Sequence, residues 1–289
     1  MNNHQPEIAP QVRERLSFID FYVFFLGKIG RKDLIERFGI SAPAATRDFR
    51  LYNEIAPNNL IYRPNERAYV KADEFKLLTP PSVEKCLSTL SFGFGDFEAI
   101  DSSLGICESS ILGAPNLQTL AVVTRTIHNK KSIKIKYFSH TSGESLKEIV
   151  PHTLVNTGMR WHCRAWDRDK QRFSDFVINR IIDTFEDNLT PESKGHELKV
   201  EDKEWNTKIT LVLVPHPRLA GKSKPIELDY NMSKGQIKVE SRLATASYLL
   251  VGWDVDYTEN AIEKREEYRL ALHNRDEIYK RFGKQLFLS

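Results

Sequence analysis

The stretch that decides the fold is residues 31–55, RKDLIERFGISAPAATRDFRLYNEI. Its apolar residues recur at helical spacing over 34–38, and Gly39 then supplies the left-handed residue that ends a helix. Ser41 is well placed as an N-cap, and Pro43 lies in the first turn of a second helix. The pattern therefore predicts a short helix, a tight turn and a further helix.

The flanking sequence extends this pattern on both sides. Residues 12–26, VRERLSFIDFYVFFL, predict a helix that is apolar on most of its circumference, which is typical of a central helix or of one that also contacts a partner chain. Residues 60–71, LIYRPNERAYVK, have two β-prone runs around a turn, which predicts a hairpin. Helices followed by a hairpin in this order indicate a winged helix-turn-helix, a fold that binds double-stranded DNA.

The residues expected to read DNA follow from this arrangement. A recognition helix needs small residues at its start, so that its backbone enters the major groove, and longer side chains that reach bases and phosphates. We expect Arg47 to contact guanine, Arg50 and Tyr52 to hold phosphates, and the hairpin tip to follow the backbone or minor groove. The predicted set is Ser41, Ala42, Pro43, Ala44, Thr46, Arg47, Arg50, Tyr52, Arg63, Asn65 and Arg67. The same order of elements also occurs in domains that bind protein.

Length and composition restrict the class of protein. A chain of 289 residues, 40% apolar and 28% charged, is typical of a multidomain globular protein. It has no run of about eighteen apolar residues that would cross a membrane, and residues 1–10 do not resemble a secretory signal, so we expect a cytoplasmic protein without membrane contact. The net charge of +3 means that any affinity for DNA depends on where the charges lie.

The three cysteines argue against a metal site. Cys86, Cys107 and Cys163 are far apart and have no nearby Cys or His partner at ligand spacing. We therefore expect buried free thiols, and we expect neither a metal nor a cofactor.

Beyond residue 75 the sequence predicts an α+β multidomain chain. Several short strand candidates after residue 130 suggest a small barrel, the polar segment 187–203 reads as a linker, and the last part mixes strands with helices. In that last part, two strands are expected around 226–230 and 236–240, and a charged helix over 261–282. The predicted divisions are 1–75 for the DNA-binding domain, 76–129 for a helical connector, 130–187 for the barrel and 188–289 for a C-terminal extension.

One strand candidate carries several potential cations on one face. In residues 160–165, RWHCRA, strict alternation places Arg160, His162 and Arg164 on one face and the intervening residues on the other. His152 and Arg180 lie in neighbouring strand candidates. An ordinary solvated strand is the alternative interpretation.

These segments resemble a known family. IKIKYFS (133–139), EIVPHTLV (148–155), GMRWHCRAWD (158–167) and RFSDFVINRI (172–181) resemble, in this order, the WYL domain, a small Sm-like barrel behind winged helix-turn-helix domains in bacterial regulators. Only the tryptophan of the name-giving tripeptide is kept, at Trp161. The histidine that follows it, together with RLSFIDF and ERFGIS near the N-terminus, is similar to the BrxR/CapW regulators of phage-defence operons such as BREX.

The resemblance implies a homodimeric repressor. Its barrel would sense a nucleic-acid or nucleotide-like ligand that relieves repression, its C-terminal α+β module would dimerise, and the dimer would occupy a pseudo-palindromic operator. Carried over by position, the ligand-binding candidates are Tyr137, Ser139, His152, Arg160, His162, Arg164, Asp175 and Arg180.

Two other functional classes bear comparison with a DNA-binding regulator. An enzyme is not expected, because adjacent strand residues such as His162 and Cys163 point to opposite faces and cannot form a dyad, and no nucleotide-binding glycine motif occurs. The alternative from another class is a protein that binds single-stranded nucleic acid through the barrel and uses its N-terminal domain to contact protein.

Overall fold

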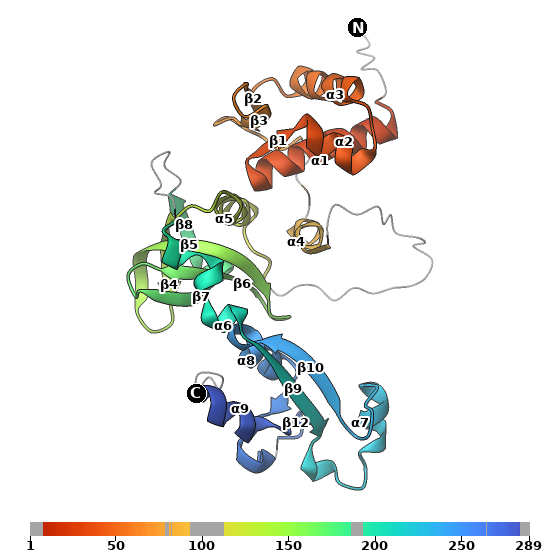
Figure 1. Ribbon diagram of the computed structural model, residues 1–289, viewed down its shortest axis with the longest axis vertical. Coiled ribbons are helices and arrows are strands. Elements are labelled where there is room, and N and C mark those ends of the chain that lie inside the picture. Colours follow the sequence, from red (N-terminus) through yellow and green to blue (C-terminus); the bar gives the residue numbers. More distant parts are fainter. Residues whose placement is uncertain are drawn as a thin grey trace.

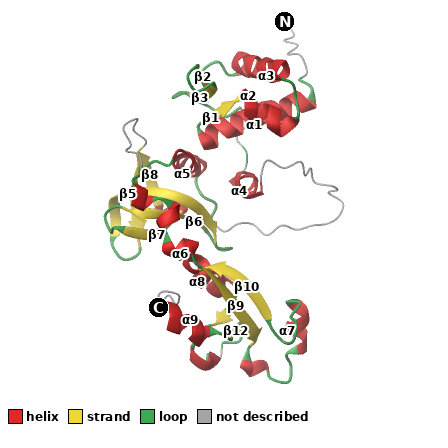
Figure 2. Ribbon diagram, in the orientation of Figure 1, coloured by secondary structure: helices red, strands yellow, loops and turns green. Residues whose placement is uncertain are grey.

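The computed structural model describes residues 8–78, 81, 83–92, 113–185, 193–263 and 265–283. Figure 1 shows an elongated chain with a helical N-terminal domain at one end, a five-stranded sheet in the middle and a smaller α/β unit at the other end. Helices and strands are mixed throughout (Figure 2), as expected of an α+β chain. None of the described helices is long and apolar enough to span a membrane.

The N-terminal domain has the predicted order of elements. It consists of α1 (Pro10–Leu26), β1 (Lys28–Gly30), α2 (Arg31–Phe38), α3 (Ala42–Ile55), β2 (Leu60–Arg63) and β3 (Ala68–Lys71). Gly39 ends α2 with a φ of +62°, and the Ser41 hydroxyl accepts a hydrogen bond from the Ala44 N–H at 3.4 Å. The hairpin pairs with the three-residue β1, which the sequence did not predict, in the order β1-β3-β2.

Helix α1 belongs to two hydrophobic cores. Its first part packs within the N-terminal domain through residues such as Ile19 and Val23, whereas Phe24 and Phe25 belong to a second core. That second core also contains residues of α4 (Val83–Phe92), of α5 (Leu117–Asn129) and of the central sheet. Arg125 of α5 is buried and donates a hydrogen bond to the Phe24 carbonyl at 2.6 Å, which fixes α5 against the end of α1.

The central sheet is antiparallel, with the order β7-β6-β5-β4-β8. Its members are β4 (Ile133–Ser139), β5 (Gly143–Asn156), β6 (Trp161–Asp167), β7 (Arg172–Val177) and, after the 3₁₀ helix η2 (Ile178–Arg180), β8 (Ile181–Phe185). Among the described residues β7 and β8 do not pair with each other, so the closed barrel expected from the sequence is not found.

The C-terminal part begins with short helical turns. These are η3 (Gly195–Glu197), η4 (Lys199–Glu201) and α6 (Lys203–Asn206). The C-terminal sheet has the order β10-β9-β12-β11. Its elements are β9 (Lys208–Pro215), η5 (Pro217–Leu219), α7 (Lys224–Asp229), β10 (Ile237–Arg242), α8 (Leu243–Gly252), β11 (Val255–Asp256), η6 (Glu259–Ala261), β12 (Leu270–Leu272) and α9 (Arg275–Phe282). We call α6 to α9 the C-terminal unit.

Several expectations for this part were wrong. Residues 224–229 form a helix, because Pro225 stands in its first turn and Ile226 packs into the C-terminal core. The helix expected over 261–282 is only α9, since Leu270 to Leu272 pair with β9 as a strand. The described part of the expected linker is ordered into helical turns and buries Glu197 and Asp202.

The cysteines agree with the expectation where they are described. Cys163 is a buried free thiol and Cys86 is buried as well, whereas Cys107 lies outside the described residues, as does the whole of 93–112 in the expected connector. No group of three His, Cys, Asp or Glu side chains placed to hold a metal ion occurs in the part of the chain that the structure describes.

Candidate nucleic-acid interface and polar face of the central sheet

Helix α3 turns one face to the core and leaves the other open. Ala45, Phe49 and Tyr52 are fully buried against the N-terminal core. The opposite face carries most of the predicted DNA-contact residues: Ser41, Ala42, Pro43, Thr46, Arg47 and Arg50 are exposed, and Ala44 is half-buried. The small residues and the arginines therefore lie together on one open surface.

The arginines on this surface differ in their partners. Arg47 makes no hydrogen bond or ion pair with any described residue, whereas the Nε of Arg50 lies 3.7 Å from a carboxylate oxygen of Glu54. The Thr46 hydroxyl donates to the Ala42 carbonyl at 3.0 Å, so it is already satisfied within the helix. Among the described residues, Arg47 is consequently an exposed cation of α3 that is free to take a new partner.

Tyr52 was wrongly assigned to phosphate binding. Its ring is fully buried, its hydroxyl donates to the carboxylate of Asp20, and it accepts a hydrogen bond from the Asn59 side-chain amide at 3.0 Å. Burial raises the pKa of Asp20 above its ordinary value, and the hydrogen bonds from Tyr52 and from the Leu78 N–H only partly oppose this. Tyr52 therefore ties α3 to α1 inside the domain and does not reach DNA.

The tip of the hairpin is exposed and carries charges of both signs. Arg63, Asn65 and Arg67 are all exposed, as the sequence predicted for a wing. Glu66 lies between them and pairs with Arg63 at 3.6 Å and with Lys28 of β1 at 3.4 Å. The wing thus presents more positive than negative charge, with one arginine held by Glu66.

On the central sheet, strand β6 alternates as predicted, but its polar face is covered. Trp161, Cys163 and Ala165 lie in the core. His162 and Arg164 on the other face are also buried, with exposed fractions of only 4% and 3%. The groups that cover them come from α6 and α8 of the C-terminal unit.

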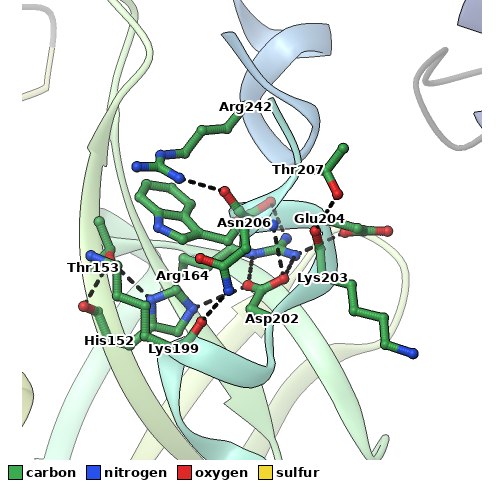
Figure 3. A network of polar contacts seen from close by, with 12 residues as sticks. His152, Thr153, Arg164, Lys199, Asp202, Lys203, Glu204, Asn206, Thr207 and Arg242 are labelled. Atoms are coloured by element: carbon green, nitrogen blue, oxygen red, sulfur yellow. Dashed lines mark hydrogen bonds and ion pairs between the residues drawn. The ribbon is translucent and has the colours of Figure 1, made fainter. Parts of the chain in front are cut away.

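Arg164 lies at the centre of a buried ionic network (Figure 3). Its Nε and Nη2 donate to the two carboxylate oxygens of Asp202 at 2.7 and 3.0 Å, Nη2 also donates to Glu204 at 2.8 Å, and Nη1 donates to Asp175 at 3.3 Å. Burial alone would raise the pKa of Asp202, but hydrogen bonds from His152 and Arg164 outweigh it and hold that pKa well below its ordinary value. Arg164 and His152 are therefore tied to α6.

His162 is covered by an aromatic ring. The ring of Tyr248, from α8, stacks on it with centroids 4.9 Å apart and an angle of 28° between the planes, while the Tyr248 hydroxyl donates to Asp175 at 3.1 Å. Burial, with repulsion from Arg160 and Arg180, lowers the pKa of His162 to about 4, so its ring is neutral at pH 7. Its buried Nδ1 has no hydrogen-bond partner among the described residues.

A cavity of about 840 Å³ lies beside this network, between the central sheet and the C-terminal unit. Tyr137, Ser139, Arg164, Asp175 and Arg180 line it, whereas His152, Arg160 and His162 do not. The structure thus brings together part of the predicted ligand set. Of the other candidates, His152 bonds to Asp202, and Arg160 lies exposed at the start of β6.

Two of the lining candidates are partly used by the fold itself. The Tyr137 hydroxyl accepts a hydrogen bond from the Val177 N–H at 3.1 Å, and Arg180 contacts the ring of His140.

The thiol of Cys163 is unsuited to nucleophilic chemistry. It is fully buried, and burial raises its pKa far above the ordinary value. A thiolate is therefore not available beside His162.

Comparison with known proteins places the chain in a family. A DNA-binding transcriptional repressor CapW of Escherichia coli is 32% identical over 275 residues, covering 92% of this chain and 90% of that protein. The CapW repressor of Pseudomonas aeruginosa is 34% identical over 276 residues, covering 91% and 89%. The chain belongs to the CapW family of DNA-binding transcriptional repressors.

Family models agree along the chain. The BrxR transcriptional regulator winged helix-turn-helix domain matches residues 11–92, the WYL domain matches 118–185, and the BrxR C-terminal dimerization domain matches 208–278. Among solved structures, the proteasome accessory factor B/C of Arthrobacter aurescens aligns with 99% of this chain and 50% of that chain, at 15% identity and a TM-score of 0.26. That last similarity is too low to support an argument.

Sequence reasoning missed several residues that contact the polar face of β6 and β7 or line the cavity. Asp202, Glu204 and Tyr248 contact the candidate residues of β6 and β7, and Trp166 and Phe173 add aromatic walls to the cavity. Alternation within the strands did not indicate Asp202, Glu204 or Tyr248, because these three come from segments far along the chain, whereas Trp166 and Phe173 lie in β6 and β7 themselves.

Proposed function

We propose that the chain is a dimeric, sequence-specific transcriptional repressor that reads a pseudo-palindromic operator with α3 and the hairpin wing, and that it controls a phage-defence operon in the cytoplasm. The observation that carries this proposal is the open face of α3, where small residues precede an unpartnered Arg47 on a helix-turn-helix. The proposal is also supported by relatives that are named as repressors and align with nearly the whole chain.

The residue roles follow from exposure and chemistry. Ala42, Ala44 and the methyl group of Thr46 suit thymine methyl contacts in the major groove, and Arg47 suits a bidentate contact to guanine. Arg50 and the wing residues Arg63, Asn65 and Arg67 suit phosphates or the minor groove, with Ser41 and Pro43 setting the start of the helix. Tyr52 takes no part.

Dimerisation follows from the C-terminal unit. Its match to a model named as a dimerization domain supports a symmetric homodimer. Two copies of α3 related by a two-fold axis fit two half-sites of a pseudo-palindrome, whose spacing the dimer sets.

The cavity beside the central sheet suits a nucleotide-like effector. Lys170, Arg172, Arg180 and Lys203 line it without an ion pair to any described carboxylate. Cations beside aromatic walls suit phosphate and base together. An effector that binds two dimer geometries unequally shifts the protein away from the one that matches the operator, and so relieves repression. We assign the chain no enzymatic role.

Binding of the DNA upstream of the chain's own gene tests the proposal. Fluorescence anisotropy is measured for wild type, for Arg47→Ala and for Lys208→Ala, a control that removes an exposed lysine of the C-terminal unit. We expect Arg47→Ala to lose roughly 1–3 kcal/mol of binding free energy and to relax sequence preference, whereas the control binds as wild type.

Two results would contradict this assignment. Unchanged affinity and preference in Arg47→Ala would remove the base-reading role of α3. A preference of wild type for single strands over duplex would favour the alternative function, in which the cavity binds single-stranded nucleic acid and the N-terminal domain contacts protein.

A further inference from the structure

The polar face of the central sheet is occupied by the chain's own C-terminal unit. Tyr248 of α8 stacks on His162 and donates to Asp175, and Asp202 and Glu204 at the start of α6 bind Arg164. Strands β6 and β7 supply the covered groups, and two separate helices supply the covering ones.

The covering groups have the chemistry of a nucleotide. Two oxygens of Asp202 accept from Nε and Nη2 of Arg164, which is the fork geometry that a guanidinium also uses for a phosphate. The Tyr248 ring stacks on a neutral imidazole, with 28° between the planes, as a base stacks on an aromatic side chain. The Tyr248 ring thus occupies the stacking surface of His162 that a base would need. The Asp202 carboxylate occupies the guanidinium of Arg164 that a phosphate would need.

The cavity lies on the outer side of this cover. Tyr248, Asp202 and Glu204 line it, and so do Arg164 and Asp175, whereas His162, on which the Tyr248 ring stacks, does not. The buried Nδ1 of His162 also lacks a partner, and such a group calls for an explanation because an unmade buried hydrogen bond is costly. The position of His162 beneath Tyr248 and the unpaired Nδ1 both fit a ligand-binding surface that the C-terminal unit occupies in this structure.

We propose that Tyr248, Asp202 and Glu204 form an internal ligand, and that an effector combining a base with a phosphate binds by displacing them from His162 and Arg164. This inference rests on the proposed function only for the chemical class of the effector. Because α6 and α8 both belong to the C-terminal unit, displacement releases that unit from the sheet and so links effector binding to dimer geometry.

Variants of the internal ligand test the proposal. Tyr248→Ala removes the ring, and Glu204→Gln removes one charge from a side chain that is 41% exposed. The matched controls are Tyr230→Ala, an exposed tyrosine, and Glu240→Gln, an exposed glutamate, both in the C-terminal unit away from the sheet face. The probes are adenosine 5′-monophosphate and a 5′-phosphorylated single-stranded thymidine tetranucleotide, and calorimetry measures their Kd.

We expect Tyr248→Ala to bind at least one probe about tenfold more tightly than wild type, because the ring of His162 no longer has to be uncovered before the probe stacks on it. Glu204→Gln should gain a few-fold, and both controls should match wild type. The probe that gains more shows whether the effector is a free nucleotide or a strand. Faster hydrogen exchange in α6 and α8 of wild type on probe binding is expected as well.

The proposal is overturned if both variants bind the probes as tightly as wild type or more weakly. It is also overturned if none of the proteins binds either probe, because the uncovered face would then lack the inferred chemistry. If Tyr248→Ala does not fold, Glu204→Gln decides alone. Operator binding by wild type, measured in parallel, reports on the proposed function separately: retained operator binding with no gain for the probes refutes only the internal ligand.

Discussion

Replacing Asp202 by asparagine should cost far more than replacing Glu204 by glutamine, although both carboxylates bind the same guanidinium. Oδ2 of Asp202 accepts from Nε2 of His152 at 3.1 Å and from Nε of Arg164 at 2.7 Å. Oδ1 accepts from Nη2 of Arg164 and from the Trp205 N–H, each at 3.0 Å. Whichever way the new amide is turned, its NH₂ group faces two donors.

The magnitude follows from these contacts. Asp202→Asn loses two hydrogen bonds, at least one of them to a charged partner, at a residue that is only 1% exposed. We expect this to lower the free energy of unfolding by about 3–5 kcal/mol. Glu204→Gln removes the negative charge from one ion pair, at a side chain that is 41% exposed. We expect this to lower the free energy of unfolding by less than about 1 kcal/mol.

Thermal unfolding followed by calorimetry separates these values. At roughly 2–4 °C per kcal/mol for a chain of this size class, the Tm of Asp202→Asn should fall by at least about 6 °C, and that of Glu204→Gln by less than about 4 °C. Urea unfolding followed by tryptophan fluorescence provides a second measurement, because buried Trp205 follows Asp202 closely. Equal destabilisation by the two variants would refute the reasoning that burial of Asp202 sets the strength of this network.

Three further predictions concern other sites. Tyr52→Phe removes the donor to Asp20 and the acceptor for Asn59, and should lower the free energy of unfolding by about 1–3 kcal/mol in urea titrations; a loss below a few tenths would contradict the buried network. The added methyl group of Gly39→Ala meets no atom within 4 Å, but the residue keeps a φ of +62°. We therefore expect backbone strain alone to lower the free energy of unfolding by about 1–2 kcal/mol, and an unchanged Tm would show that the turn relaxes. Burial lowers the pKa of His162 from 6.5 to about 4, so its neutral form stabilises the fold above pH 6.5 and this contribution, on the order of 3 kcal/mol, is lost as pH falls towards 4. His162→Phe should flatten that part of the stability profile, and an equally steep profile in the variant would assign the pH dependence to another group.

The local elements of the N-terminal domain were predictable because their signals are local. Gly39 and the Ser41 cap fixed the turn between α2 and α3, and both act within a few residues. Strand β1 had no such signal, since three residues next to Gly27 become a strand only through their pairing with β3. Tyr52 was misread although a signal existed: it shares its helical face with Ala45 and Phe49, which marks the core side of α3.

The polar face of β6 shows where prediction from sequence ends. Alternation correctly placed Arg164 opposite the core, but the partners that bury it follow 38 and 40 residues later, in and next to a segment that reads as a polar linker. A carboxylate such as Asp202 is compatible with burial only when cations surround it, and only the tertiary structure brings them there. The stacking of Tyr248 on His162 is equally non-local, since it joins a strand to a helix of the last unit.

The position of α1 in two cores has a consequence for any attempt to divide the chain. A fragment of residues 1–75 would keep the winged helix but turn Phe24 and Phe25 towards water, because α5 and the central sheet that cover them would be missing. Such an apolar surface favours aggregation. The smallest piece expected to stay folded with α3 in place therefore extends through α5 and the central sheet. Within it, α1 packs against the central sheet at one end and against α3 at the other, so it joins the two cores directly.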